Sequence, residues 1–232
     1  MRAIPALLLL GVGALAQASE CVVLLHGMAR TPYSLEPMNE ALQEAGFATA
    51  NIGYPSRKHT IEVLAPMAVG EGLDKCRSKK ETEKIHFVTH SLGGILLRLY
   101  LSENVIPELG RVVMMGPPNQ GSDAADEMRN FPGFGVVNGP AALQLGKGEG
   151  SVPLALGPAN FELGVIAGTR TIDPVTSSFL ENPDDGRVSV EDTKLEGMKD
   201  HVIVDHSHAF MMRMNDTKEL TIRFLKTGKF SE

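Results

Sequence analysis

The chain contains six short apolar runs, each of a length that suits one buried strand. Within each run valine, isoleucine and leucine mostly follow one another, rather than alternating with polar residues. This pattern is typical of strands covered on both faces, as in a parallel sheet flanked by helices. It predicts an α/β fold with a mostly parallel central sheet, whose strands span residues 21–26, 47–54, 84–90, 111–116, 162–168 and 201–206.

Three other segments carry apolar residues at helical spacing, which predicts helices that pack on this sheet. The first covers residues 34–46 and stops at a glycine, and the second covers residues 91–104. The third covers residues 215–228, where Asn215 or Asp216 is a plausible cap and a glycine ends the helix.

The regular pattern stops between residues 116 and 161. Residues 133–150 contain six glycines and a proline, which predicts a loop with at most one short helix. A long irregular insertion in a compact domain is often a lid or the wall of a cleft, or else it is disordered, so residues 133–150 are a candidate for a cleft wall with disorder as the alternative. Without repeats or a clear linker, the pattern indicates a single domain without a large separate lid.

The N-terminus has the layout of a secretory signal peptide. One basic residue precedes an apolar run from Ala3 to about Ala16, and small residues follow at positions 16 and 18. The run is shorter than the roughly 20 residues that span a membrane. We therefore expect residues 1–18 to be removed and residues 19–232 to form an exported catalytic domain, periplasmic or secreted, without an integral membrane anchor; an uncleaved anchor is the alternative.

Composition narrows the choice of partners and cofactors. The 232 residues include 22 Lys and Arg against 28 Asp and Glu. Removal of Arg2 with the signal peptide gives the mature chain a formal net charge of 21 − 28 = −7. Nucleic acid is an unsuitable partner, because binding it requires clustered basic residues. No metal-ligand spacing, phosphate loop or dinucleotide fingerprint is present in the sequence, so we expect neither a metal nor a cofactor.

The chain has two cysteines, Cys21 and Cys76. Cys21 opens the first predicted strand, and Cys76 lies near the end of a helical segment that leads into residues 84–90. Such ends can be neighbours, and an exported protein can keep an even number of cysteines as disulfides. We therefore predict one disulfide, with two unpaired apolar side chains as the alternative.

One heptapeptide carries candidate chemistry: VTHSLGG, residues 88–94, which joins an apolar run to a helical segment. Its serine, Ser91, would lie on a tight turn at the carboxyl edge of the sheet, where ligands bind in open α/β folds. A serine hydroxyl is a weak nucleophile until a base takes its proton. Ser91 is therefore a candidate nucleophile that needs partners from elsewhere in the chain.

This turn resembles the G-x-S-x-G nucleophile elbow of the α/β-hydrolase family, in particular of small secreted bacterial lipases and esterases. The resemblance covers about residues 21–230 and rests on four segments in the family's order: LLHGM, THSLGG, DDGRVSV and HSHAF. Thr89 departs from the pattern, because it stands where the elbow has its first glycine. A β-branched residue suits a strand end but is bulkier, so we expect a turn that is kept and slightly opened.

Two backbone amides are candidates for an oxyanion hole, which stabilises the negative charge that develops on the carbonyl oxygen during acyl transfer. Leu92 follows Ser91 at the start of the predicted helix and supplies the first. The resemblance implies that Met28, directly after His26 and Gly27, supplies the second from the loop after the first strand. A plain turn at these residues is the alternative.

The base must follow Ser91, because this fold has the order Ser, acid, His. Three histidines qualify, and His201 is set aside because it begins the last predicted strand. His206 and His208 share one loop at the edge that carries Ser91, and spacing does not separate them. The resemblance favours His208, which directly precedes AFMMRM, with His206 as the alternative.

The acid must accept the Nδ1 hydrogen bond of that histidine from a loop beside the strand ends. The DDG turn, with an alternating, strand-like stretch after it at Val188 and Val190, resembles the DG-x-V acid segment of these lipases and favours Asp185. Asp173, which follows the strand that ends at Gly168, is the main alternative. The full set of candidates is Asp173, Asp184, Asp185, Asp192, Asp200 and Asp205.

The expected function is hydrolysis of carboxylic esters, with a small-molecule or lipid ester as substrate. The triad that the resemblance implies consists of Ser91, His208 and Asp185, acting through an acyl-enzyme. The same triad serves thioesters and amides, so a thioesterase or an amidase is an alternative, as is an inactive relative that only binds.

Overall fold

All six predicted strands are present, and they form one sheet in which every neighbouring pair is parallel. Their order across the sheet is β2-β1-β3-β4-β5-β6. The connections after β1 and after β2 therefore lead to opposite sides of β1, and the strand order reverses between β1 and β3. The crevice above such a reversal is where open α/β sheets bind ligands. The strands are β1 (Ser19–Leu25), β2 (Ala48–Ile52), β3 (Thr82–His90), β4 (Leu109–Met115), β5 (Leu163–Gly168) and β6 (Asp200–Val204).

The structure is a computed structural model that describes residues 19–79 and 82–232. The predicted signal peptide, residues 1–18, lies outside the described residues and stays a prediction. Within the described ranges, no helix is both long enough and apolar enough to cross a membrane.

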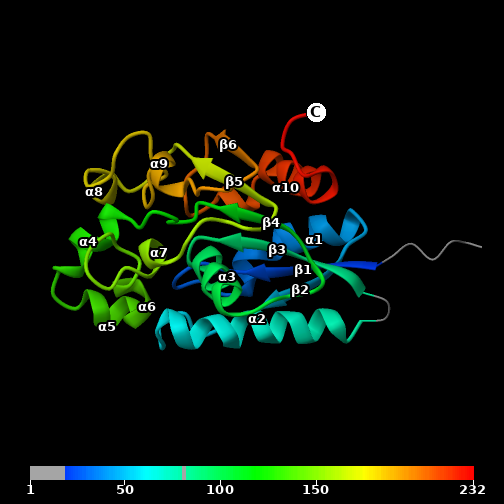
Figure 1. The fold of residues 1–232 in the computed structure, drawn as a ribbon. Helices are drawn as coiled ribbons and strands as arrows, with labels where there is room; N and C mark the ends of the chain where they lie inside the picture. Colours follow the sequence, from blue (N-terminus) through cyan, green and yellow to red (C-terminus); the bar gives the residue numbers. More distant parts are fainter. Residues whose placement is uncertain (1–18, 80–81) are drawn as a thin grey trace, which may run out of the picture.

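Helices cover both faces of the sheet (Figure 1). On one face α2 (Ile61–Arg77) and α3 (Leu92–Glu103) pack over a core that includes Val23 and Phe87. On the other face α1 (Glu36–Glu44) and α10 (Asn215–Thr227) pack over a second core. Successive residues of β1 alternate between these two cores, as the pleat of a strand requires, which explains its unbroken apolar run.

Two helix boundaries differ from the prediction. Residues 34–46 are divided between the 3-10 helix η1 (Pro32–Leu35) and α1. At α10 neither Asn215 nor Asp216 is the cap: Met214 holds the extended cap conformation, and no side chain caps the helix. The Asp216 carboxylate is instead bonded to His206, a contact that local sequence does not reveal.

The glycine-rich insertion contains more helix than predicted. Residues 133–150 hold two short helices, α5 (Phe134–Asn138) and α6 (Pro140–Leu143), preceded by α4 (Asp123–Arg129) and followed by α7 (Val152–Ala155). The prediction of at most one helix was wrong because the glycines punctuate the helices instead of breaking them. Gly133 and Gly139 lie at their ends with φ of 84° and 81°, which glycine adopts readily.

The stretch after the DDG turn is also not a strand. Val190 opens the short helix α9 (Val190–Thr193), and the hydroxyl of Ser189 caps it by accepting the Asp192 amide hydrogen. Only one isolated bridge, between Asp184 and Ser189, remains of the predicted extended pattern. The remaining short helices are α8 (Pro174–Ser177) and η2 (Met211–Arg213).

The predicted disulfide is confirmed. Cys21 at the start of β1 is bonded to Cys76 near the end of α2, with the two Cα atoms 5.8 Å apart. Both residues are fully buried. The bond joins the central sheet to the helix over it at the end opposite the carboxyl edge.

Candidate active site

Ser91 lies on the turn between β3 and α3, in a backbone conformation that is unusual for serine. Its φ is +52°, and Ser91 and Ala29 are the only residues other than glycine with positive φ in the described chain. The Ser91 amide donates to the carbonyl of Met115 at 2.9 Å, which joins the turn to β4. Strained residues of this kind persist where the surroundings fix them, and they concentrate at functional sites.

Glycines make this turn possible. A Cβ on Gly93 would lie 2.5 Å from the Leu25 carbonyl oxygen, so only glycine allows α3 to approach β1 this closely. Thr89, the departure from the elbow pattern, is fully buried at the end of β3. A Cβ on Gly94 would lie 3.3 Å from its Oγ1, so Gly94 provides the space for the bulkier residue, and the turn is retained.

Asp185 and His208 are joined twice. The Nδ1 of His208 lies 2.7 Å from Oδ2 of Asp185, and the His208 amide donates to the Asp185 carbonyl at 3.0 Å. Oδ1 of Asp185 accepts the amides of Arg187 and Val188 at 3.0 and 2.9 Å. The carboxylate is 1% exposed and aimed at the imidazole, so the proton of His208 is held on Nδ1 and the Nε2 lone pair is left for chemistry.

The other candidate histidines contact different partners. The Nε2 of His206 lies 2.7 Å from Oδ1 of Asp216 on α10. The Nε2 of His201 lies 3.1 Å from Oγ1 of Thr193. Neither lines the cavity that contains Ser91.

The other candidate acids are also engaged elsewhere. Asp173 caps α8 and pairs with Arg187 Nη2 at 3.1 Å, and these hydrogen bonds, above all that from the Thr176 amide, lower its pKa. Asp184 accepts the Ser177 hydroxyl at 2.8 Å. The remaining three contact other groups: Asp192 contacts Lys147, Asp200 accepts the Phe230 amide, and Asp205 pairs with Arg170.

Ser91 and His208 line the same cavity, which has a volume of about 330 Å³. Most of its wall is apolar and comes from the insertion, with Met128, Phe134 and Leu145 among the lining side chains. The insertion therefore forms a wall of the cleft. Among residues 19–79 and 82–232, Ser91 Oγ has no hydrogen-bonded partner, and such bonds commonly tighten only when a substrate binds.

The loop after β1 packs directly on the Ser91 turn. A Cβ on Gly27 would lie 3.2 Å from Cβ of Ser91, so the glycine allows this approach. Met28 lines the cavity, and Ala29 after it has φ of +55°. The Ala29 amide donates to the buried hydroxyl of Ser56 at 3.0 Å, which ties the turn to the segment after β2.

Sequence reasoning missed three side chains that contact this loop or the loop of His208: Ser56, Tyr54 and His90. Besides Ser56, Tyr54 stacks on His26 with ring centroids 4.0 Å apart, and its hydroxyl donates to the His26 carbonyl. Burial raises the pKa of Tyr54 and lowers the pKa of His26. His90 directly precedes Ser91, so its place in the motif was a usable signal, whereas Tyr54 and Ser56 carry no local mark.

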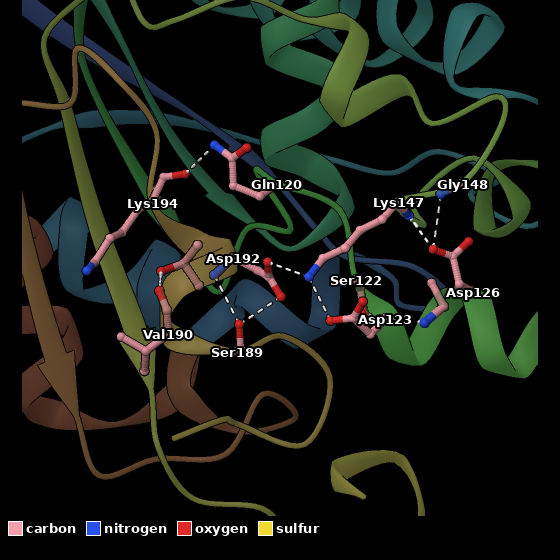
Figure 2. A network of polar contacts seen from close by, with 12 residues as sticks. Gln120, Ser122, Asp123, Asp126, Lys147, Gly148, Ser189, Val190, Asp192 and Lys194 are labelled. Carbon is pink, nitrogen blue, oxygen red and sulfur yellow. Dashed lines mark hydrogen bonds and ion pairs between the residues drawn. The ribbon is translucent and has the colours of Figure 1, made fainter. Parts of the chain in front are cut away.

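A charged network joins the insertion to the segment after Asp185. Figure 2 shows the ammonium group of Lys147 between two carboxylates, at 2.6 Å from Asp123 and 2.8 Å from Asp192. Asp126 on α4 also accepts the Lys147 amide. These contacts link α4, the loop at Lys147 and α9, and hold this wall of the cleft beside the segment that follows Asp185. Within the described residues, no group of three or more His, Cys, Asp or Glu is arranged to hold a metal.

Comparisons with known proteins give matches among solved structures alone. No protein-family profile matches the chain, and no curated protein sequence does. A Bacillus licheniformis lipase in its mature form has a TM-score of 0.72 and 17% identity, over 90% of this chain and 92% of its own. A Legionella pneumophila phospholipase has a TM-score of 0.66 and 18% identity, over 92% of this chain and 60% of its own. A metagenomic carboxyl esterase has a TM-score of 0.64 and 17% identity, over 83% of this chain and 65% of its own.

At this level of identity the comparisons establish the fold. The described chain has the α/β-hydrolase fold, and it resembles lipases and esterases in the arrangement of its sheet and helices. The resemblance expected from the sequence is thereby confirmed. The chemistry of the site is a separate question, because one fold hosts many activities.

Proposed function

We propose that this protein is a serine hydrolase that acts on carboxylic esters, as an esterase or lipase. The observation that carries the proposal is the buried pair of Asp185 and His208, which shares one apolar cavity with Ser91 on its strained turn. Nucleophile, base and orienting acid come from three different loops at one sheet edge. Convergence of that kind is the mark of a catalytic site rather than of ordinary packing.

In this mechanism the Ser91 hydroxyl attacks the ester carbonyl while Nε2 of His208 takes its proton. Asp185 keeps the imidazole in the required tautomer and stabilises its protonated form. The amides of Met28 and Leu92 stabilise the oxyanion. His208 then gives its proton to the leaving alcohol, and water releases the acid from the acyl-enzyme.

Two further observations support an acyl substrate. The wall of the cavity offers apolar side chains from the insertion, which suit the hydrocarbon part of an ester. The solved structures of similar fold include a lipase, a phospholipase and a carboxyl esterase. These activities belong to those proteins, and together they favour ester chemistry for this one.

The proposal includes export to the periplasm or the medium. A disulfide such as Cys21–Cys76 forms and persists in oxidising compartments, which agrees with the predicted signal peptide. N-terminal sequencing of the protein from the native host tests this. A mature chain that begins at Ser19 would agree with the proposal, and an intact Met1 would contradict it.

Labelling with a fluorophosphonate tests the mechanism, because only an activated serine reacts. We expect the wild-type protein to be labelled and to hydrolyse p-nitrophenyl butanoate, and Ser91→Ala to lose both properties. His208→Ala should lose them as well, whereas His206→Ala, a matched change two residues away, should retain them. A folded wild-type protein that is neither labelled nor active would refute the proposal.

A further inference from the structure

A second cavity, of about 350 Å³, opens on the other side of His208. Three residues line both cavities: Arg30, Arg187 and His208. The rest of the second wall comes from the loop after β5, with Ile172 and Asp173, and from the Asp185 turn. The base therefore stands between an apolar chamber and a more polar one.

The first cavity differs in charge from the molecule as a whole, whereas the wall of the second also contains the carboxylates of Asp173, which pairs with Arg187, and Asp185, which is bonded to His208. The chain as a whole carries a net charge of −6, yet no acidic side chain of the described residues lines the first cavity. Apart from the two histidines, the ionisable side chains in its wall are the guanidinium groups of Arg30 and Arg187. Both arginines stand where the cavities meet, so the positive charge is concentrated beside the reacting groups.

The two guanidinium groups are held differently. Arg187 pairs with Asp173 at 3.1 Å and contacts the sulfur of Met128 at 3.5 Å, which holds it across the cleft. The exposed Arg30 side chain makes no ion pair or hydrogen bond within residues 19–79 and 82–232. Its charge still acts on the site. The pKa of His90 is lowered first by burial and then by the charge of His208, and the Arg30 charge lowers it further.

We propose that the alcohol portion of the substrate ester carries an anionic group, which Arg30 and Arg187 bind at the junction of the cavities. The inference rests on the proposed ester hydrolysis. His208 must give its proton to the leaving alcohol, so the alcohol lies beside His208 while the acyl group occupies the apolar cavity. The second cavity, with both arginines in its wall, is the space that remains for the alcohol.

The chemistry of the two side chains fits a phosphate or carboxylate. A guanidinium group presents parallel N–H donors that match two oxygens of either anion. Arg187 already shares its charge with Asp173, so Arg30 is the group that gains most from an anionic ligand. The reaction needs no additional reactant, because water takes the acyl group and His208 returns the proton to the alcohol.

Three soluble esters with one acyl group test this inference in the full-length mature protein. They are 1-butanoylglycerol, 1-butanoylglycerol 3-phosphate and 3-butanoyloxypropanoate. The measured quantity is the ratio of kcat/KM for each anionic ester to that for the neutral one, at low ionic strength. We expect a wild-type ratio above about ten, which falls in 0.5 M salt as the charges are screened.

Arg30→Gln should lower this ratio about tenfold, the loss expected for one charged hydrogen-bonding group. Lys226→Gln removes the same charge from an exposed position on α10 outside both cavities, and should keep the wild-type ratio. The two anionic esters identify the source: a higher ratio for the phosphate ester indicates a phosphorylated alcohol, and a higher ratio for the carboxylate ester a hydroxy acid.

Two results would overturn this inference and leave the proposed ester hydrolysis standing. One is labelling of Ser91 together with equal hydrolysis of neutral and anionic esters, and the other is an unchanged ratio in Arg30→Gln. Failure of the proposed function looks different, since then no ester is hydrolysed and Ser91 is not labelled.

Discussion

The imidazole of His90 is hydrogen-bonded to the main chain of His208: its Nε2 lies 2.9 Å from the His208 carbonyl oxygen, across 118 residues of sequence. A carbonyl oxygen only accepts, so the proton of His90 is on Nε2. His90 directly precedes Ser91. The bond therefore joins the Ser91 turn to the loop of His208, and in the proposed mechanism His90 is a positioning residue for the triad.

His90→Phe removes this donor and keeps a ring of similar size. We expect kcat to fall about fivefold with little change in KM, because the lost bond is worth about 1 kcal/mol and orients the base rather than the substrate. His90→Gln, whose amide nitrogen can replace Nε2, should recover most of the activity. Steady-state kinetics on p-nitrophenyl butanoate measures both. Equal losses in the two variants would contradict the positioning role.

Asp185 should be the acid of the site, since it is buried and contacts Nδ1 of His208. Asp185→Asn reverses the hydrogen-bonding preference at that nitrogen and should lower kcat by about 10³ to 10⁴. The matched control is Asp205→Asn, which changes an exposed carboxylate that pairs with Arg170 and should retain activity. If Asp173→Asn and not Asp185→Asn gave the large loss, the assignment would be wrong.

Buried histidines should make the protein less stable in mild acid. Burial lowers the pKa of four histidines in the folded protein, namely His26, His86, His90 and His201. Below the unfolded pKa of about 6.5, the unfolded chain therefore binds protons that the folded chain does not, and the free energy of unfolding falls as pH falls. Each histidine contributes up to about 1.4 kcal/mol per pH unit.

Urea unfolding at pH 7.5 and 5.5 measures this effect. We expect a lower midpoint at pH 5.5 and a smaller difference between the two pH values in His90→Gln, which removes one of these four histidines. The carboxylates with lowered pKa, such as Glu162, lose their contribution only in stronger acid, outside this window. Equal midpoints at the two pH values would show that the histidines do not control stability.

The disulfide should stabilise the fold without serving catalysis. Cys21 and Cys76 are 55 residues apart, and closing a loop of that length lowers the entropy of the unfolded chain by an amount worth about 4 kcal/mol. The double variant Cys21→Ala/Cys76→Ala should therefore unfold at a lower urea concentration. Its kcat should match the wild type at 20 °C, because the bond lies at the sheet end opposite Ser91. An unchanged unfolding midpoint would contradict this view.

The strands and the motif order were predictable because their signals are local. A strand buried on both faces must be apolar throughout, so β1 and β5 are visible as uninterrupted runs. The turn at Ser91 is visible for the same reason, since the small residues that it needs lie beside it in sequence. The insertion was misread because a glycine can end a helix as well as prevent one.

The choice between histidines was not predictable from spacing. His206 and His208 lie two residues apart, and what separates them is the position of Asp216 on α10 and of Asp185 after a different strand. Both partners are brought in by the tertiary fold. The same holds for Ser56, whose value depends on a loop 27 residues earlier that it contacts only in the folded chain.

Ser56 should position the oxyanion loop. Ala29 has φ of +55°, which costs a residue with a Cβ about 1 kcal/mol, and its amide is held by the Ser56 hydroxyl at 3.0 Å. Ser56→Ala removes that acceptor, so the turn can relax. The preceding N–H group, that of Met28, is then no longer directed at the position of the oxyanion. We expect kcat to fall about tenfold with KM nearly unchanged, because the oxyanion exists only in the transition state and the intermediate that follows it.

Two further variants distinguish an effect on the orientation of the Met28 amide from an effect on the stability of the fold. Ser34→Ala deletes a similarly buried hydroxyl, which donates to the Thr31 carbonyl, and should lower stability without lowering kcat. Ala29→Gly removes the cost of the positive φ, so in the Ser56→Ala background it should recover part of the lost kcat. A rise in KM at constant kcat in Ser56→Ala would instead place Ser56 in substrate binding, because a group that aims an oxyanion donor acts on the transition state and not on the bound ester.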